Sequence, residues 1–199
     1  GSEGNLLDPG PHSCRLIRLD NPLIDNKQLA QLREVSLSGF KATTLDALFV
    51  AKDNGAGLEK GFEELCAAAD KAIADGFNIL IVSDRNISAT HAAMPTLLVM
   101  GGLHHHLVRS GTRTKVSIVL ETGEAREVHH FSTLIGFGAD AINPYMAFDS
   151  IHQMITDEMM DIDFDKAVYN FLKGSIKGVV KTMAKMGIST VASYRGAQI

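Results

Sequence analysis

The sequence is poor in cysteine, in basic residues and in long apolar runs, and each shortage excludes a class of function. Two cysteines among 199 residues are too few for a disulfide framework or for cysteine ligation of an iron–sulfur cluster. The 19 Lys and Arg residues do not outnumber the 23 Asp and Glu residues, so no positive charge excess attracts nucleic acid or an anionic membrane. No apolar run approaches the ~20 residues that span a bilayer, and no basic-then-apolar leader opens the sequence. We therefore expect a protein of a reduced, cytoplasmic setting that binds neither nucleic acid nor membrane.

The length of 199 residues is typical of one domain with a sizeable core. Residues 1–2, Gly-Ser, are typical of an expression scar. Residues 3–13 hold two prolines and two glycines among mostly polar residues, which predicts an extended N-terminal segment. The remaining residues, 14–199, are predicted to form a single α/β domain.

Apolar spacing predicts short strands that alternate with helices. The strands are expected at residues 14–19, within 42–50, and at 77–82, 117–121, 139–142 and 188–192. The helices are expected at about residues 25–36, 58–74, 95–109, 124–136, 145–159 and 165–186. The strand, helix and strand within residues 117–142 form a βαβ unit, which usually makes a right-handed crossover onto a parallel sheet. The alternation is typical of either a doubly wound open sheet or a (β/α) barrel, and spacing alone does not separate them.

Several long runs resemble one protein family. They are ETGEAREVHHF, GFGADAINPYMAF and KMGISTVASYRGAQI, together with SDRNISATHAAMPTLLVMGGLHHHLVRSGTRTKVSIVL. These runs resemble the central domain of the glutamate synthase large (α) subunit over almost all of residues 78–199, and residues 6–77 resemble it less tightly. The resemblance favours a parallel sheet with alternating helices, curved like an incomplete (β/α) barrel.

The resemblance also implies a function. Glutamate synthases convert glutamine and 2-oxoglutarate into two glutamates with electrons from NAD(P)H or ferredoxin, and so serve glutamate biosynthesis and nitrogen assimilation. An amidotransferase domain releases ammonia from glutamine, and a synthase domain with FMN and a 3Fe-4S cluster consumes it. The resemblance implies a non-catalytic central domain that couples these two domains and contributes to the surroundings of the ammonia tunnel between them. We therefore expect no catalytic, metal-binding or cofactor-binding residue in this chain.

The resemblance implies partners and a location as well. The expected partners are the amidotransferase and FMN-binding domains of the same, longer chain. We also expect weak self-association of the isolated domain, because apolar faces that neighbouring domains normally cover would be exposed. The parent enzyme is expected in the cytoplasm, or in a plastid if the parent is from a plant.

The segment Gly55–Gly61 is the main signal for a different function. It approximates the dinucleotide fingerprint, and Asp84 follows the next strand, where an acidic residue binds a ribose hydroxyl. This would make the chain a stand-alone NAD(P)-binding oxidoreductase. However, the glycine spacing is one residue too long and the preceding strand is weakly indicated. The sequence favours a glycine turn before an ordinary helix.

Acidic and histidine residues suggest a second alternative, a small metal-dependent enzyme that uses Glu121 and His130. Glu121 ends a parallel strand, where α/β enzymes place their chemistry. Glu124 and Glu127 are predicted in the first helical turn, where carboxylates favour the helix dipole. Glu127 and His130 form only one half of a di-iron signature, and the side chains of residues 104–106 point about 100° apart on a helix. Structural roles are therefore favoured for all of them.

Two further features agree with a domain that has no cofactor of its own. A phosphate-binding barrel would carry a glycine-rich turn after residues 138–142, but Asn143, Pro144 and Tyr145 stand there. Proline has no N–H to offer a phosphate. Cys66 lies in an amphipathic helix among alanines, where a buried, inert thiol is expected.

Overall fold

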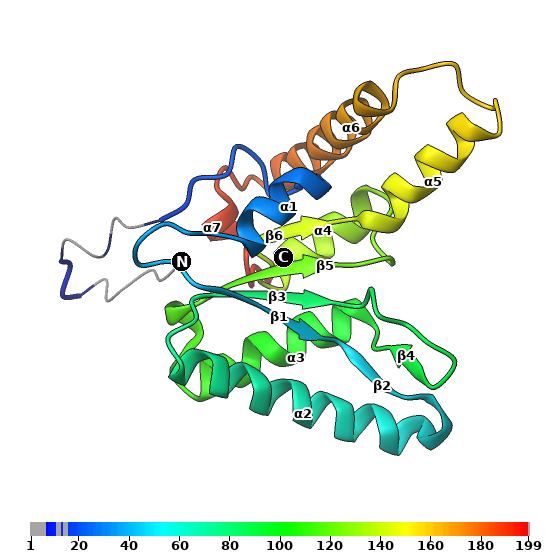
Figure 1. The fold of residues 1–199 in the computed structure, drawn as a ribbon. Helices are drawn as coiled ribbons and strands as arrows, with labels where there is room; N and C mark the ends of the chain where they lie inside the picture. The colour runs from blue at the N-terminus through cyan, green and yellow to red at the C-terminus, as the bar shows by residue number, and fades with distance from the viewer. Residues whose placement is uncertain (1–6, 11–12, 14–15, 199) are drawn as a thin grey trace.

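The computed structural model describes residues 7–10, 13 and 16–198 and is organised around a four-stranded parallel sheet (Figure 1). The strand order is β1-β3-β5-β6. These strands are β1 (Ala42–Asp46), β3 (Ile79–Ser83), β5 (Ser117–Glu121) and β6 (Ala141–Asn143). A separate antiparallel pair consists of β2 (Leu48–Val50) and β4 (His91–Ala93). The chain is thus α/β, with a parallel sheet that does not close into a barrel.

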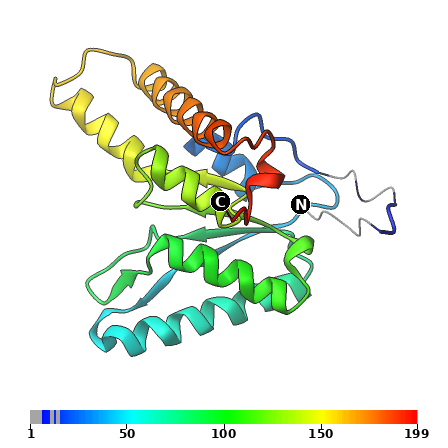
Figure 2. The same cartoon turned by 180° about the vertical axis from the view of Figure 1, so that it is seen from behind.

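Helices connect these strands. They are α1 (Asn26–Arg33), α2 (Asn54–Ala74), α3 (Thr96–Arg109), α4 (Val128–Gly136), α5 (Tyr145–Thr156), α6 (Phe164–Lys185) and α7 (Val191–Tyr194), with 3-10 turns η2 (Ala51–Asp53) and η3 (Arg113–Lys115). Figure 2 shows α2 and α3 on the same side of the sheet, with α5 and α6 projecting as a hairpin. Among the described residues, no helix is long and apolar enough to cross a lipid bilayer.

The sheet is covered on both faces, which explains its almost continuous apolar strands. Along β3, Leu80 and Val82 join the larger core with residues of α2, α3 and α4. Ile79 and Ile81 face the other way and pack with Leu29 and other residues of α1 and the preceding segment. The three crossover helices therefore lie on one face, and the strands follow chain order. This singly wound arrangement is that of a barrel segment, whereas a doubly wound sheet places helices on both faces and reverses its order.

Two predicted strands are wrong. Leu16–Leu19 form no strand, and residues 14–15 lie outside the described residues. The strand expected at 188–192 is replaced by α7, because the Thr190 side chain accepts a hydrogen bond from the Ser193 N–H and caps a helical turn. The strand expected within residues 42–50 is divided into β1 and β2, which belong to different sheets.

Several helix boundaries also differ from the prediction. The glycine turn expected before residue 58 is instead the first turn of α2, which begins at Asn54. Helix α4 begins at Val128, because the Glu127 side chain accepts the His129 N–H and acts as its N-cap. Helix α5 ends at Thr156, and Glu158 beyond it has a positive φ of 57° that breaks the helix. The helix expected at about residues 25–36 is α1, and Asp25 is its N-cap, with a capping box to Gln28.

Candidate functional site at the carboxyl edge of the sheet

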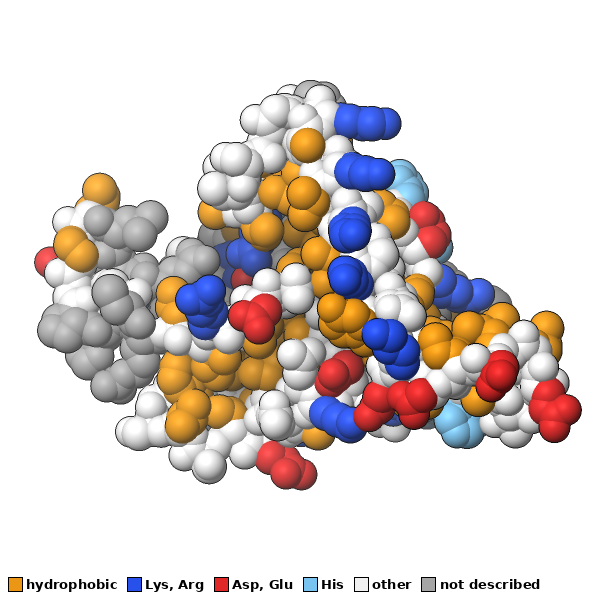
Figure 3. All heavy atoms as spheres, turned by 90° about the horizontal axis from the view of Figure 1, so that it is seen from above, with side chains coloured by type: hydrophobic (Ala, Val, Ile, Leu, Met, Phe, Trp, Pro, Cys, Tyr) orange, Lys and Arg blue, Asp and Glu red, His pale blue; other side chains and the backbone are white. Residues whose placement is uncertain are grey.

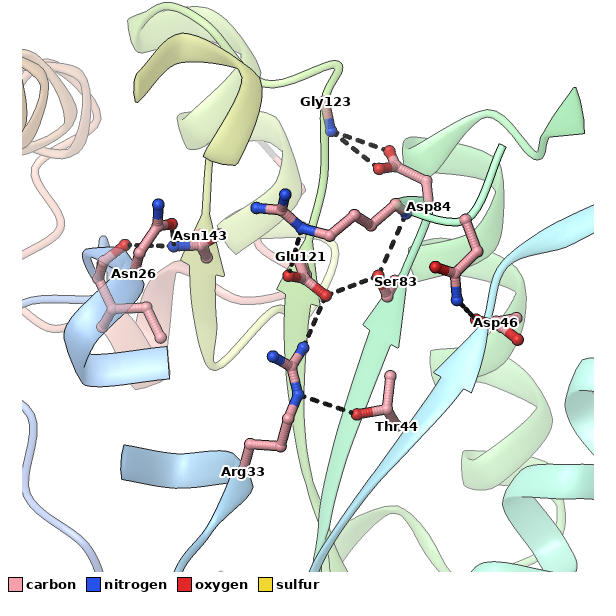
Figure 4. Close-up of polar contacts among 12 residues, drawn as sticks. Asn26, Arg33, Thr44, Asp46, Ser83, Asp84, Glu121, Gly123 and Asn143 are labelled. Atoms are coloured by element: carbon pink, nitrogen blue, oxygen red, sulfur yellow. Dashed lines mark hydrogen bonds and ion pairs between the residues drawn. The ribbon is translucent and has the colours of Figure 1, made fainter. Parts of the chain in front are cut away.

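The four parallel strands end in a row of polar residues. The sheet register aligns Asp46 with Ser83, Ser83 with Glu121, and Glu121 with Asn143. Figure 4 shows these side chains at the carboxyl ends of their strands, together with side chains of the loops that follow. This edge is where parallel α/β enzymes place their chemistry. It is therefore the first candidate for a functional site.

Glu121 is the centre of this row and is almost fully buried, with a side chain 3% exposed. One oxygen, Oε2, accepts hydrogen bonds from Arg33 Nη2 at 2.8 Å and from Ser83 Oγ at 2.6 Å. The other oxygen, Oε1, accepts from Arg85 Nε at 2.9 Å. The two arginine side chains are 42% and 43% exposed and lie over the carboxylate. A general base must reach a substrate proton, whereas Glu121 is bound by three donors of its own chain.

Asp84 is bound in the same way. Its Oδ2 accepts from Thr122 Oγ1 at 2.8 Å, and both of its oxygens lie 3.0 Å from the Gly123 N–H. Burial raises the pKa of the Tyr145 hydroxyl, and a hydrogen bond to Asp84 adds to the shift, so this phenol stays protonated as a donor. The Arg85 guanidinium lies 4.0 Å from the centre of the Tyr145 ring, a cation–π contact. Asp84 is therefore already engaged where a ribose hydroxyl would need it.

The last strand adds a fixed amide. Asn143 is fully buried, and its Nδ2 donates to the Ile24 carbonyl at 3.2 Å and to Asn26 Oδ1 at 2.9 Å. Its Oδ1 has no partner among the described residues. At the opposite end of the row, Asp46 Oδ1 accepts from Asn86 Nδ2 at 3.0 Å. The strand ends are thus tied to α1 and to the loop after β3.

We call Asp46, Ser83, Asp84, Glu121 and Asn143 the strand-end cluster, and this cluster leaves almost no room for a ligand. The hollow beside Asp84, Thr96 and Glu121 measures about 10 Å³, about the smallest space that holds one water. Four larger hollows, of about 320, 260, 350 and 480 Å³, are not lined by Asp84 or Glu121, and Thr96 lines only the last of them. Drug-sized ligands usually occupy about 300 Å³ or more. The polar row therefore forms a filled network of hydrogen bonds.

The structure gives Gly55–Gly61 a packing role. These residues lie inside α2, which follows the antiparallel strand β2 and not a strand of the parallel sheet. A Cβ atom on Gly57 would lie 2.6 Å from the Val50 carbonyl oxygen, and one on Gly61 would lie 2.9 Å from Phe49 Cβ. The glycines let α2 approach β2 closely. The NAD(P)-binding alternative, which needs a tight turn between a parallel strand and its helix, is not supported.

The residues of the metal alternative lie in separate contacts. Glu121 is bound to arginines, whereas His130 Nδ1 accepts the Arg126 N–H and its Nε2 lies 3.6 Å from Glu127 Oε1. No group of three or more His, Cys, Asp or Glu in the described part of the chain is arranged to hold a metal ion. The metal-enzyme alternative is not supported.

The three consecutive histidines have contacts in different directions. His106 Nε2 lies 2.8 Å from Asp70 Oδ2 on α2, and His104 Nδ1 accepts from Arg113 Nε at 3.1 Å. The His105 ring packs edge-on against the His104 ring. Burial and the nearby Arg113 lower the pKa of His104, which favours its neutral form. Their divergence agrees with the expectation that consecutive helical residues do not converge.

Glu124 and Cys66 also have structural roles. Glu124 lies before α4, not in its first turn, and its Oε2 accepts the Thr96 N–H at 2.6 Å at the start of α3. Cys66 is buried, and burial raises the pKa of its thiol, so it is not an activated nucleophile. Cys14 lies outside the described residues.

Sequence reasoning identified Glu121 but missed its partners. Arg33, Ser83 and Arg85 hold the carboxylate, and none of them belongs to a recognisable motif. The sequence indicated these partners of Glu121 only indirectly. A carboxylate at the end of an apolar strand is expected to be buried, and a buried charge needs a cation. Arginines at or just after the ends of other helices and strands, such as Arg33 and Arg85, were therefore the candidate partners of the Glu121 carboxylate.

Comparison with known proteins finds one family. The profile described as "Glutamate synthase central domain" matches residues 1–199. Over its whole length the chain is 47% identical to the glutamate synthase (NADPH) large chain of Bacillus subtilis, of which it covers 13%. It is 36% identical to the glutamate synthase (NADH) of Schizosaccharomyces pombe and to the chloroplastic ferredoxin-dependent glutamate synthase of Spinacia oleracea, of which it covers 10% and 13%. The chain thus spans about a tenth to an eighth of the length of these relatives.

A solved structure shares the fold. A mutant flavocytochrome b2 with benzoylformate is similar over 66% of this chain and 31% of that chain, with a TM-score of 0.51 and 13% sequence identity. At this identity the likeness concerns the fold alone.

Proposed function

The chain belongs to the glutamate synthase central domain family, and on that basis we propose that it is the non-catalytic linker of a larger glutamate synthase. In this role it joins a glutamine amidotransferase domain to a synthase domain with FMN and a 3Fe-4S cluster. Residues 14–199 act as a single domain that keeps the two centres in register and contributes to the surroundings of the ammonia tunnel between them. The parent converts glutamine, 2-oxoglutarate, two electrons and two protons into two glutamates.

The observation that carries the proposal is the bonding of the strand-end cluster. In a barrel enzyme this edge presents free acids, bases and phosphate-binding N–H groups. Here the carboxylates of Glu121 and Asp84 accept hydrogen bonds from the chain's own donors, and Pro144 follows β6 in place of an N–H donor. This supports a domain without catalytic, cofactor-binding or metal-binding residues. FMN and the cluster are then held elsewhere in the parent.

The partners and location follow from the same proposal. The neighbouring amidotransferase and FMN-binding domains cover faces of this domain in the parent. Separated from them, the chain self-associates weakly through the apolar surface left exposed. The parent works in the cytoplasm, or in a plastid in plants.

A ligand screen tests the absence of a cofactor site. The purified chain is melted with FMN, NADH, NADPH, glutamine, 2-oxoglutarate and divalent cations, and its absorbance is scanned between about 300 and 600 nm. We expect no visible absorbance and no saturable rise in Tm, because the chain is proposed to have no cofactor site. The assay is sensitive, since a ligand present at 100 times its Kd would add about 2.7 kcal/mol to the free energy of unfolding. A saturable rise with FMN or a dinucleotide would overturn the proposal.

A second test measures coupling in the full-length parent. Arg85→Ala loosens the loop over Glu121 in the parent enzyme without touching either proposed centre. We expect more glutamine to be hydrolysed per glutamate formed, with unchanged FMN and cluster absorbance, because the register of the two centres is relaxed. Lys115→Ala, an exposed change in η3, is the matched control and should leave the ratio unchanged. Loss of synthesis from added ammonia in the Arg85 variant would instead indicate a direct role in the chemistry.

A further inference from the structure

The hairpin of α5 and α6 projects from the body of the protein (Figures 1 and 2). We call residues 149–185 the α5–α6 arm. No residue between 149 and 165 is buried, although this part contains isoleucines, methionines and a phenylalanine. Met159, in the connecting loop, is 69% exposed. The outer part of the arm, residues 149–165, buries little apolar surface, whereas α6 packs Val179 and Met183 into the core. The position of the outer part therefore benefits from a partner.

Charge divides the arm into two parts. The acidic tip consists of Asp157, Glu158, Asp161, Asp163 and Asp165, and Asp149 lies on α5 nearer the body; no Lys or Arg occurs in residues 149–165. The lysine row consists of Lys166, Lys173, Lys177, Lys181 and Lys185, with no Asp or Glu between them. All eleven side chains belong to exposed residues. Of these eleven residues, all of them described, only Asp165 takes part in an ion pair, which it forms with Lys27 at 3.0 Å.

Helical geometry places the lysine row on one face of α6. Residues three, four or seven apart share a face, and the lysines are spaced by seven, four, four and four. Viewed from above, a line of basic side chains runs along the top of the molecule, where α6 lies, and ends near acidic side chains (Figure 3). Beside this row, Tyr169 and Val180 are 54% and 57% exposed. This face of α6 therefore carries charged side chains of positive sign only, next to exposed apolar ones.

We propose that the α5–α6 arm is the surface through which two copies of this chain associate. The arms pair in opposite directions about a two-fold axis, and the acidic tip of each lies along the lysine row of the other. A two-fold interface requires one patch that is complementary to itself, and the division of charge supplies this. Nucleic acid and anionic membranes do not fit, because the acidic tip would repel their phosphates. The inference rests on the weak self-association proposed above and assigns it to the arm, where opposite charges set the pairing beside the exposed apolar side chains of Tyr169 and Val180.

The size of the arm sets the strength of the association. Helix α6 has 22 residues and is therefore about 33 Å long and ~10 Å wide. Two arms paired in opposite directions along a helix of this size cover less than the ~800 Å² per partner of a typical stable interface. The dimer is therefore weak, with a Kd above about 1 μM. Exposed ion pairs are screened at a Debye length of about 3 Å in 1 M salt, so the dimer dissociates at high salt.

Charge reversal tests the pairing directly. The first variant carries Lys173→Glu, Lys177→Glu and Lys181→Glu. The second variant carries Asp157→Lys, Glu158→Lys and Asp161→Lys. Sedimentation equilibrium at low salt should show that each variant alone dimerises at least about tenfold more weakly than the unchanged chain. An equimolar mixture of the two should associate again, because each then meets the opposite charge.

The control reverses three lysines on the other side of the molecule. It carries Lys52→Glu, Lys60→Glu and Lys71→Glu, which lie in η2 and α2. This control should dimerise like the unchanged chain. Circular dichroism of each variant tests whether it is folded. If a triple variant fails to fold, Lys177→Glu alone replaces the first and Asp161→Lys alone the second.

Three outcomes would overturn the inference. The unchanged chain remains monomeric at hundreds of micromolar, or the control weakens association as much as the lysine-row variant, or the two arm variants fail to associate with each other. None of these outcomes bears on the linker function, which is judged by the ligand screen and by coupling in the parent. Failure of the two proposals is thus distinguishable.

Discussion

Replacing Gly57 with alanine should destabilise the chain, whereas replacing Gly55, two residues earlier, should not. Gly57 is buried, and its added Cβ would lie 2.6 Å from the Val50 carbonyl oxygen and 2.9 Å from Asp53 Cβ. Gly55 is exposed, has no atom within 4 Å of its added Cβ, and has no positive φ. The two substitutions therefore make the same chemical change in the same helical turn, with and without a steric conflict.

The contacts set the magnitude. Ordinary contacts of a Cβ atom begin near 3.4 Å, so α2 must move from β2 by several tenths of an ångström to admit the methyl group of alanine at Gly57. Overpacking of this kind costs about 1–3 kcal/mol, and the better helix propensity of alanine offsets up to about 1 kcal/mol. The net loss should be about 1–2 kcal/mol, which lowers Tm by about 2–8 °C in a domain of this size. At Gly55 only the propensity gain remains, so Tm should stay the same or rise by about 1–3 °C.

Urea unfolding and thermal melting of the two variants provide the measurement. The midpoint should shift while the m-value stays constant, because the surface exposed on unfolding does not change. The reasoning would be refuted if both variants were equally stable, or if the alanine at Gly55 were the more damaging. The same pair examines the dinucleotide alternative, in which both glycines approach a phosphate. That alternative predicts that the Gly55 variant abolishes a nucleotide-dependent rise in Tm.

Three further predictions concern the interior and pH. Glu121→Gln should lower the free energy of unfolding by about 1–3 kcal/mol by chemical denaturation, since it removes a buried charge from two half-exposed arginines; an unchanged midpoint would show that the ion pairs contribute nothing. In α6, Gly178→Ala should cost about 1–3 kcal/mol, because its Cβ would meet the Val128 side chain, while Gly174→Ala, one turn earlier and in open space, should gain up to about 1 kcal/mol. Folding lowers the pKa of His104, so the folded chain binds its proton less tightly than the unfolded chain does. The folded state is therefore not penalised by this histidine above the unfolded pKa of about 6.5, and it loses stability as pH falls from there towards the folded pKa. Melting of His104→Gln between pH 5 and 7.5 should therefore show a weaker pH dependence than the unchanged chain, and an identical dependence would disprove this.

The strands of the sheet were predictable because burial on both faces leaves a mark in the sequence. The residues of β3 and β5 form nearly continuous apolar runs, which are typical of a parallel strand that is buried on both faces. The antiparallel pairing of β2 with β4 was not predicted. Residues 48–50 were expected to continue the strand that begins at residue 42, and no strand was expected at His91–Ala93, because three residues with none buried are too short for their periodicity to distinguish them from a loop. The false strand at residues 188–192 has apolar spacing compatible with a strand, and the capping bond of Thr190 decides in favour of a helical turn.

The site was only partly predictable because its contacts join distant parts of the sequence. Glu121 was recognised by its place at the end of β5, but Arg33 lies 88 residues earlier in the chain, at the end of α1. Its proximity follows from the packing of α1 on the second face of the sheet, and no local pattern encodes that. The same packing decides the chemistry. In an open pocket, a carboxylate at this position would be a candidate general base. Glu121 instead lies under two arginines and beside a hollow of about 10 Å³, and it links the end of β5 to α1 and to the loop after β3. The interpretation as a scaffold therefore depends on the tertiary contacts of Glu121 with Arg33, Ser83 and Arg85, and the stability of Glu121→Gln measures these contacts together.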